Sequence, residues 1–156
     1  MKTLSGKVSE LSTKYHLTEC SIDVECIYQM GDLSEVLKES LSALLPDTNI
    51  EISEALSEDN DRYVATLSHE GRKIIDIFAD THADFLPDSF SMSFESIPAL
   101  LGTTRLFCLI NPTITGQLMW YICGLPQDLE SAKSDGLPII LPGEDFMAQD
   151  VSEYLP

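Results

Sequence analysis

The chain has few basic residues. Nine Lys and Arg residues face 26 Asp and Glu residues among 156, which gives a formal net charge of −17. Residues 74–104 contain no Lys or Arg at all. An excess of negative charge repels nucleic acid and anionic membrane surfaces, and it attracts basic proteins. We therefore expect a basic protein as the partner, and neither nucleic acid nor a membrane.

Motifs for the common active sites are also missing. The sequence has no Gly-x-Ser-x-Gly turn and no glycine-rich phosphate-binding motif. None of the four cysteines belongs to a Cys-x-x-Cys pair and the three histidines are scattered, so the usual spacing of zinc ligands is absent. Asp80, Asp84 and Asp88 lack the order of a calcium-binding loop. The sequence predicts a protein that is not an enzyme and that uses no metal or cofactor.

The absence of long apolar segments bears on location. Residues 1–7 begin with a basic residue but are followed by no apolar stretch, unlike a secretory signal. Residues 106–125 are nearly uncharged, yet Asn111 and Gly116 interrupt them, whereas a membrane helix needs about 20 apolar residues. We therefore expect a soluble, cytoplasmic protein.

The length and composition fit one folded domain over residues 1–156. Hydrophobic residues make up 44% of the chain, which is close to the usual share for a globular domain. Cys108 and Cys123 lie in apolar stretches, and we expect both thiols to be buried and reduced. The acidic tail from about residue 144 is expected to be partly mobile.

Local patterns in the first third of the chain predict a helix, a strand and a second helix. Apolar residues at helical spacing favour a helix over residues 2–15. Residues 20–28 alternate apolar and acidic side chains, which favours a half-buried strand, with a short helix as the alternative. Asp32, followed three residues later by Glu35, is typical of a capping box at the start of a helix that Pro46 ends.

The middle of the chain predicts a β-meander. Residues 50–53 alternate Ile with polar side chains, and two further strands are expected at 63–68 and 73–79. Between them, in the turn at 69–72, Gly71 can supply the positive φ that a tight hairpin needs.

The second half predicts a helix followed by two buried strands. The helix starts after Pro87 and continues to Leu101, and Pro98 should shorten or kink it. The strands, at 105–110 and 117–123, lie in a stretch without acids, so we expect them to be buried on both faces.

A short helix from Pro126 and an apolar edge strand at 137–141 complete the predicted elements. The sum is an α+β fold: a single domain with a largely antiparallel sheet and helices packed on one side.

The acidic stretch contains the predicted partner-binding residues. A run of charge is usually only a solvated face, and that alternative stays open for much of the chain. Apolar side chains beside the acids, such as Phe85, are instead typical of protein interfaces, where apolar anchors are surrounded by polar groups. The predicted partner-binding residues are Asp76, Asp80, His82, Asp84, Phe85 and Asp88.

Several segments between about residues 60 and 140 carry a resemblance to a known class of protein. They are residues 63–67 and 73–77 around the glycine turn, 84–90, 105–107 and 117–121. In pattern, size and acidity they resemble the small immunity proteins that accompany bacterial polymorphic and contact-dependent-inhibition toxins. The resemblance implies binding to a cognate toxin domain, often a nuclease, occlusion of its active site, and no catalysis by the immunity protein.

An acidic chaperone of type III secretion is the alternative function. Such chaperones are also small α+β proteins, usually homodimers, and they wrap an extended segment of an effector. The second half of this chain is richer in strands than their layout suggests. An unrecognised enzyme is a third alternative.

Overall fold

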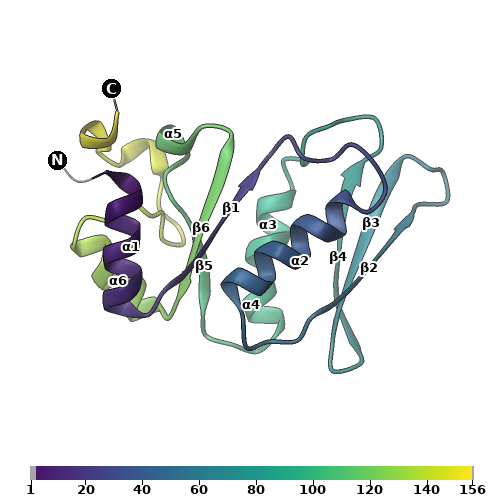
Figure 1. The fold of residues 1–156 in the computed structure, drawn as a ribbon, viewed down its shortest axis with the longest axis horizontal. Coiled ribbons are helices and arrows are strands. Elements are labelled where there is room, and N and C mark those ends of the chain that lie inside the picture. The colour runs from purple at the N-terminus through teal and green to yellow at the C-terminus, as the bar shows by residue number, and fades with distance from the viewer. Residues whose placement is uncertain (1–2, 156) are drawn as a thin grey trace.

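A computed structural model describes residues 3–155 and has the predicted α+β fold (Figure 1). The strands are β1 (Thr18–Asp23), β2 (Glu51–Leu56), β3 (Arg62–His69), β4 (Arg72–Asp80), β5 (Leu106–Leu109) and β6 (Leu118–Gly124). The α-helices are α1 (Leu4–Tyr15), α2 (Asp32–Leu44), α3 (Phe90–Glu95), α4 (Ile97–Leu100), α5 (Pro112–Thr115) and α6 (Pro126–Ser134). Two short 3-10 helices follow, η1 (Phe146–Ala148) and η2 (Ser152–Tyr154).

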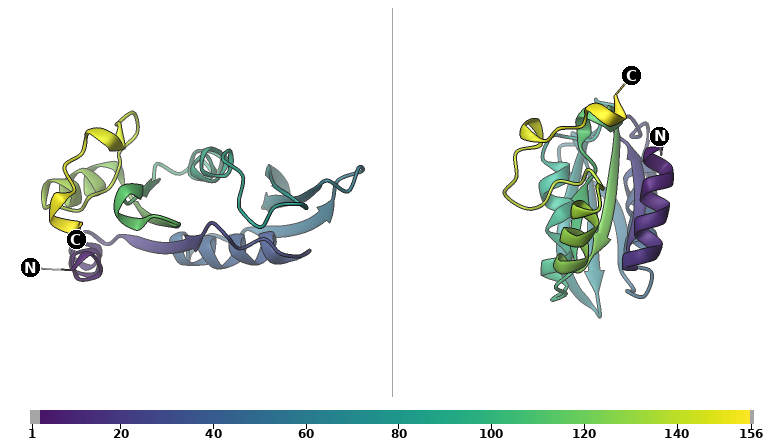
Figure 2. Two further views of the ribbon diagram at one scale, coloured as in Figure 1. Left: turned by 90° about the horizontal axis from the view of Figure 1, so that it is seen from above. Right: turned by 90° about the vertical axis from the view of Figure 1, so that its left-hand side faces the viewer.

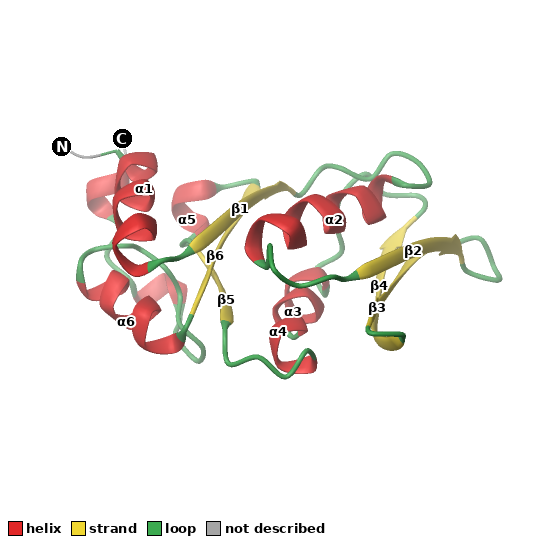
Figure 3. Ribbon diagram, turned by 60° about the horizontal axis from the view of Figure 1, so that its bottom comes forward, coloured by secondary structure: helices red, strands yellow, loops and turns green. Residues whose placement is uncertain are grey.

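The strands form two antiparallel sheets, where the sequence had predicted one sheet with helices on one side. The sheets have the orders β1-β6-β5 and β2-β3-β4 (Figure 3). The second sheet is a meander of strands adjacent in sequence, and α3 and α4 follow it in the chain before β5 begins. Helices α1 and α6 lie at one end of the molecule, beside the first sheet, while α2 and α3 lie between the two sheets (Figures 1 and 2). The first sheet therefore has helices on both faces.

The second half of β6, from Tyr121 to Gly124, is buried on both faces, as the lack of charge predicts, whereas Leu118 at its start is exposed. Tyr121 and Cys123 belong to the central core between the sheets. Ile122 and the half-buried Trp120 belong to a second core with α1 and α6. Cys108 and Cys123 are both buried, which confirms this part of the prediction, and their reduced state stays a prediction.

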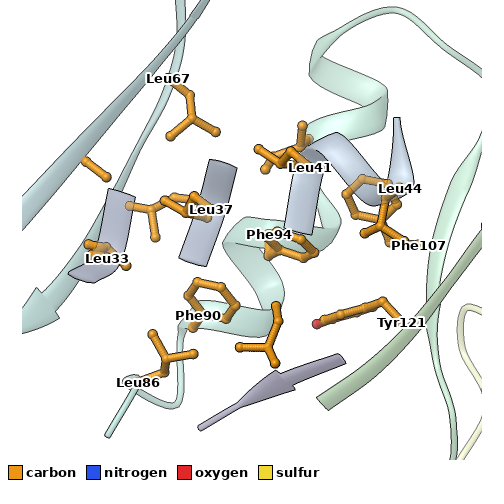
Figure 4. Close-up of a cluster of buried hydrophobic side chains, with 14 of the residues drawn as sticks. Leu33, Leu37, Leu41, Leu44, Leu67, Leu86, Phe90, Phe94, Phe107 and Tyr121 are labelled. Atoms are coloured by element: carbon orange, nitrogen blue, oxygen red, sulfur yellow. The ribbon is translucent and has the colours of Figure 1, made fainter. Parts of the chain in front are cut away.

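Aromatic rings join α3 to the first sheet within the central core. The ring centroid of Phe94 lies 5.3 Å from that of Phe90, 5.1 Å from that of Phe107 and 5.0 Å from that of Tyr121 (Figure 4). Phe94 is completely buried. Full burial of a side chain of this size contributes about 1.5–3 kcal/mol, so this cluster holds α3 firmly in place.

The hairpin of β3 and β4 confirms the most detailed sequence prediction. Glu70 and Gly71 form its two-residue turn with φ values of 52° and 76°. Two consecutive positive φ values are what a type I′ turn requires, and its twist matches that of the paired strands. The predicted break at Pro98 is also confirmed, because α3 ends at Glu95 and α4 begins at Ile97.

The start of α2 differs from the predicted capping box. Asp32 is the first helical residue, and its carboxylate accepts hydrogen bonds from backbone N–H groups that precede the helix. The helix cap comes from strand β2, where the carboxylate of Glu54 accepts from the backbone N–H of Gly31 (2.6 Å) and of Ser34 (2.7 Å). The side chain of Glu35, predicted as the second member of a capping box, takes no part in this cap. A local motif could not reveal this cap, because its acceptor comes from a distant strand.

The predicted strand at 20–28 is shorter than expected. It ends at Asp23, whose Oδ1 accepts a hydrogen bond from the Glu25 N–H at 2.9 Å. Such a side-chain bond to the backbone two residues on turns the chain out of the strand. Tyr28, predicted to face the core, is consequently exposed. The strand expected at 137–141 is reduced to one isolated bridge, between Ile110 and Ile139.

The acidic tail makes specific contacts with the rest of the protein. The side-chain amide of the buried Asn111 donates to the Phe146 carbonyl and to the Gln149 side chain, both at 2.9 Å. The Tyr154 hydroxyl donates to the Gly136 carbonyl at 3.0 Å. The predicted mobility of the tail stays a prediction, and these contacts argue for an anchored segment. None of the helices within residues 3–155 is both long and apolar enough to cross a membrane.

Candidate functional site

Asp76 is paired within the protein itself. It lies in β4, where its carboxylate accepts from Lys73 Nζ at 2.6 Å and from Thr66 Oγ1 at 2.7 Å. These two hydrogen bonds, the one from Lys73 first, hold the pKa of Asp76 below its usual range. Because its charge is already balanced by a neighbouring lysine, Asp76 offers less to a basic partner than the other predicted acids.

Asp80 and His82 lie beside the turn between β2 and β3. Asp80 ends β4 and is paired in register with Arg62 of β3. His82 Nε2 is 3.5 Å from Asp61 Oδ1, and both side chains are mostly exposed. Asp88 is exposed as well, in the turn before α3. Among the described residues, no side-chain hydrogen bond or ion pair joins these three residues to Asp84 or Phe85.

Asp84 and Phe85 pair instead with the segment that follows β1. Glu25 and Phe85 form an isolated antiparallel bridge. The backbone N–H groups of Cys26 and Ile27 both donate to the Asp84 carbonyl at 3.0 Å, and the Leu86 N–H donates to the Val24 carbonyl at 2.8 Å. This pattern makes Glu25 and Phe85 a non-hydrogen-bonded pair, the kind in which side chains of opposite residues lie closest together on one face.

At this bridge, the neighbouring side chains of Leu86 and Phe85 point in opposite directions, one into the core and one toward solvent. Leu86 is 8% exposed and belongs to the central core, whereas Phe85 is 50% exposed. Alternation along an extended segment explains the difference, because successive side chains point to opposite faces. Burial of Leu86 thus fixes Phe85 in an outward position.

Hydrogen bonds also hold the acids around Phe85. Gln117 Nε2 donates to Asp23 Oδ1 at 3.1 Å and to Glu25 Oε2 at 3.3 Å. The Tyr28 hydroxyl donates to Glu25 Oε1 at 3.3 Å, although Tyr28 is 61% exposed. Partial desolvation, and then the charges of Glu25, Asp84 and Asp23, raise the pKa of Tyr28.

We define the docking surface as these acids and exposed rings: Asp23, Glu25, Tyr28, Asp84 and Phe85. Two segments without Lys or Arg contribute to it, residues 15–37 and residues 74–104. Exposed carboxylates next to aromatic rings are suited to the ammonium and guanidinium groups of a protein partner. Among the described residues, no group of three or more His, Cys, Asp or Glu is placed to hold a metal ion.

Asp23, Glu25 and Tyr28 belong to this surface but were not among the predicted partner-binding residues, and Tyr28 had been expected in a half-buried strand. Its apparent alternation with Asp23 and Glu25 had placed it on a buried strand face. The absence of bases from 15–37 is the signal that could have drawn attention to this segment, but its pairing with residue 85 is a long-range contact that local patterns do not contain.

Comparison with known proteins gives no match to a protein-family model, to a curated protein sequence or to a solved structure.

Proposed function

We propose that the protein is an immunity protein that binds a basic toxin domain through the docking surface and neutralises it. The observation that carries the proposal is the position of Phe85: a half-exposed ring beside Glu25 and Asp84, fixed outward by backbone hydrogen bonds and by the buried Leu86. Residues that dominate binding energy are commonly aromatic anchors of this kind near the centre of an interface.

Preorganisation supports the proposal. Binding normally costs about 0.5–1.5 kcal/mol for each flexible side chain that it orders. Here the carboxylates of Asp23 and Glu25 already accept hydrogen bonds from Gln117, and Tyr28 is joined to Glu25. A partner therefore meets a surface whose groups are largely in place, and less of its binding energy is lost in ordering them.

Charge defines the kind of partner. With a net charge of −17, the protein attracts a basic domain over a long range, and Asp23, Glu25 and Asp84 provide local contacts for Lys or Arg. A nuclease toxin would fit, since it must itself bind a polyanion. In this proposal the protein acts in the cytoplasm by covering the toxin's active site, and it performs no catalysis.

Growth protection tests this function directly. Reading frames beside this one would be searched for a basic toxic domain, and each candidate would be expressed in bacteria with or without the protein. We expect the wild-type protein to restore growth and to form a stable complex with the domain, and Phe85→Ala to lose both. Met147→Ala, which shortens another exposed apolar side chain on the tail, is the matched control and should protect fully. A stable complex with an effector segment, without protection, would favour the secretion chaperone instead.

A further inference from the structure

A cavity of about 550 Å³ lies between α3, β5 and the segment 140–146. None of the residues of the docking surface lines it, so it is a separate feature of the molecule. Its volume lies within the range of about 300–1,000 Å³ that is usual for small-molecule sites. Its wall is mostly apolar, with contributions from Met92, Leu106, Leu109, Ile140 and Phe146.

Among the described residues that line this cavity, the charged groups are two carboxylates, and only one of them is paired with a basic residue. Glu144 accepts a hydrogen bond from Lys133 Nζ at 2.8 Å and another from the Leu141 N–H at 2.8 Å. Glu95, by contrast, has no Lys, Arg or His within ion-pair distance in residues 3–155. The cavity therefore has one uncompensated negative group.

The carboxylate of Glu95 has one oxygen engaged and one available. Its Oε2 accepts from the Tyr121 hydroxyl at 2.9 Å, and no hydrogen bond from the described residues reaches its Oε1. Partial burial raises the pKa of Glu95, and the Tyr121 hydroxyl offsets part of this effect. Glu95 is a solvent-exposed residue, so a positive group could approach Oε1 and form a charge-assisted hydrogen bond with it.

The wall opposite α3 is anchored. The buried Asn111 bonds to the Phe146 carbonyl and, through its Oδ1, accepts from the Thr113 N–H at 2.9 Å. Together with the Glu144–Lys133 pair, these bonds fix the segment that closes the cavity. The protein's own hydrogen bonds therefore hold this part of the cavity wall in position.

We propose that this cavity binds a small amphipathic cation, an amine with an apolar body, whose ammonium group lies against Glu95 Oε1. The apolar body contacts Leu106, Leu109 and Phe146. Charge complementarity selects a cation over an anion, and the apolar wall selects a hydrocarbon body over a bare inorganic ion.

Three probes of equal length test the proposal: n-hexylammonium, n-hexanol and hexanoate, each titrated into the isotopically labelled full chain and followed by the amide resonances of the lining residues. We expect hexylammonium to shift these resonances with an affinity about tenfold higher than that of hexanol, since a hydrogen bond to a charged group is worth roughly 1.5 kcal/mol or more. Hexanoate should bind most weakly. Glu95→Gln should remove the advantage of the ammonium, whereas Glu130→Gln, the same loss of charge on α6, should preserve it.

Several results would overturn the assignment. Equal affinities for the three probes would mean that the cavity recognises only apolar groups, such as a side chain of a protein partner. Shifts confined to acidic surfaces outside the cavity would show non-specific attraction to the net charge. Leu141→Trp, designed to fill the cavity from the tail side, keeps the test independent of whether Glu95→Gln folds. It should weaken the binding of hexylammonium and of hexanol alike. Unchanged binding of both would place the probes elsewhere.

Discussion

Glu25 and Phe85 lie opposite each other in an antiparallel bridge, although α2 and the entire second sheet separate them in the chain. The backbone on both sides of this pair is hydrogen-bonded, and the adjacent Leu86 is buried in the central core. A carboxylate and a phenyl ring are thereby held side by side at the surface. This relationship is the basis of the proposed binding function.

Association with a basic domain should depend strongly on salt. The attraction between oppositely charged proteins accelerates their encounter and is screened at about 10 Å in 0.1 M salt. We expect the association rate to fall markedly as NaCl is raised from about 50 to about 500 mM, while the dissociation rate changes much less. Both rates can be measured by stopped-flow fluorescence. An association rate that does not respond to salt would exclude charge steering.

The long-range cap of α2 should contribute measurably to stability. Glu54→Ala removes the acceptor for the Gly31 and Ser34 N–H groups, and we expect the free energy of unfolding to fall by about 1–2 kcal/mol in urea denaturation. Glu51→Ala changes an exposed acid of the same strand and should cost only a few tenths of that amount. Equal effects of the two changes would show that the hydrogen bonds to α2 carry no stability.

Glu95 should give the stability a distinctive pH dependence. Because burial raises its pKa in the folded state above the ordinary value of 4.5, the native protein binds more protons than the unfolded chain between these two pKa values. The wild type should therefore lose stability as the pH rises from about 4.5 through the raised pKa, and the loss should then level off. Glu95→Gln lacks this loss, so its unfolding free energy relative to wild type should increase across that window.

Glu144 provides a control of opposite sign for the same experiment. Its pKa is lowered by the hydrogen bonds from Lys133 and from the Leu141 backbone, so its contribution is present above 4.5 and disappears as the pH falls through the lowered pKa. Glu144→Gln should accordingly become less stable, relative to wild type, as the pH rises. Curves of the same sign for the two variants would contradict one assignment: that of Glu144 if both rise with pH, and that of Glu95 if both fall.

The thiols should react slowly in the folded protein. Burial raises the pKa of Cys20 and Cys26 to about 11 and that of Cys108 to about 12, and the thiolate is the reactive form. With a chromogenic disulfide reagent at about pH 7.5, we expect Cys108 and Cys123 to be labelled only as fast as the protein unfolds. Rapid labelling of either in the native state would identify an accessible, activated cysteine instead.

Elements that depend on local chemistry could be predicted from the sequence. The hairpin of β3 and β4 was predictable because Gly71 supplies a positive φ between two strand-like segments, and the break before α4 because Pro98 cannot continue a helix. The two buried cysteines were predictable from the apolar residues around them. In each case neighbours in the sequence provide the physical cause.

Features that depend on distant contacts could not be predicted in this way. The cap of α2 comes from Glu54, the partner of Phe85 is Glu25, and Asn111 anchors the tail. Periodicity and turn chemistry cannot predict these pairs, since each joins residues that are far apart in the chain. The hydrogen bonds from Lys73 and Thr66 to Asp76, one of the predicted partner-binding residues, were likewise not part of the sequence prediction.

The most direct test of the binding function is the affinity of purified variants for the cognate toxic domain that the growth assay identifies, measured by calorimetry with folding verified separately. We expect Phe85→Ala and Asp84→Ala each to lose about 2 kcal/mol of binding free energy, which raises Kd roughly 30-fold. Asp76→Ala and Met147→Ala should bind nearly as tightly as wild type. Near-wild-type affinity of both Phe85→Ala and Asp84→Ala would contradict it, because exposed groups outside an interface change affinity by only a few tenths of a kcal/mol.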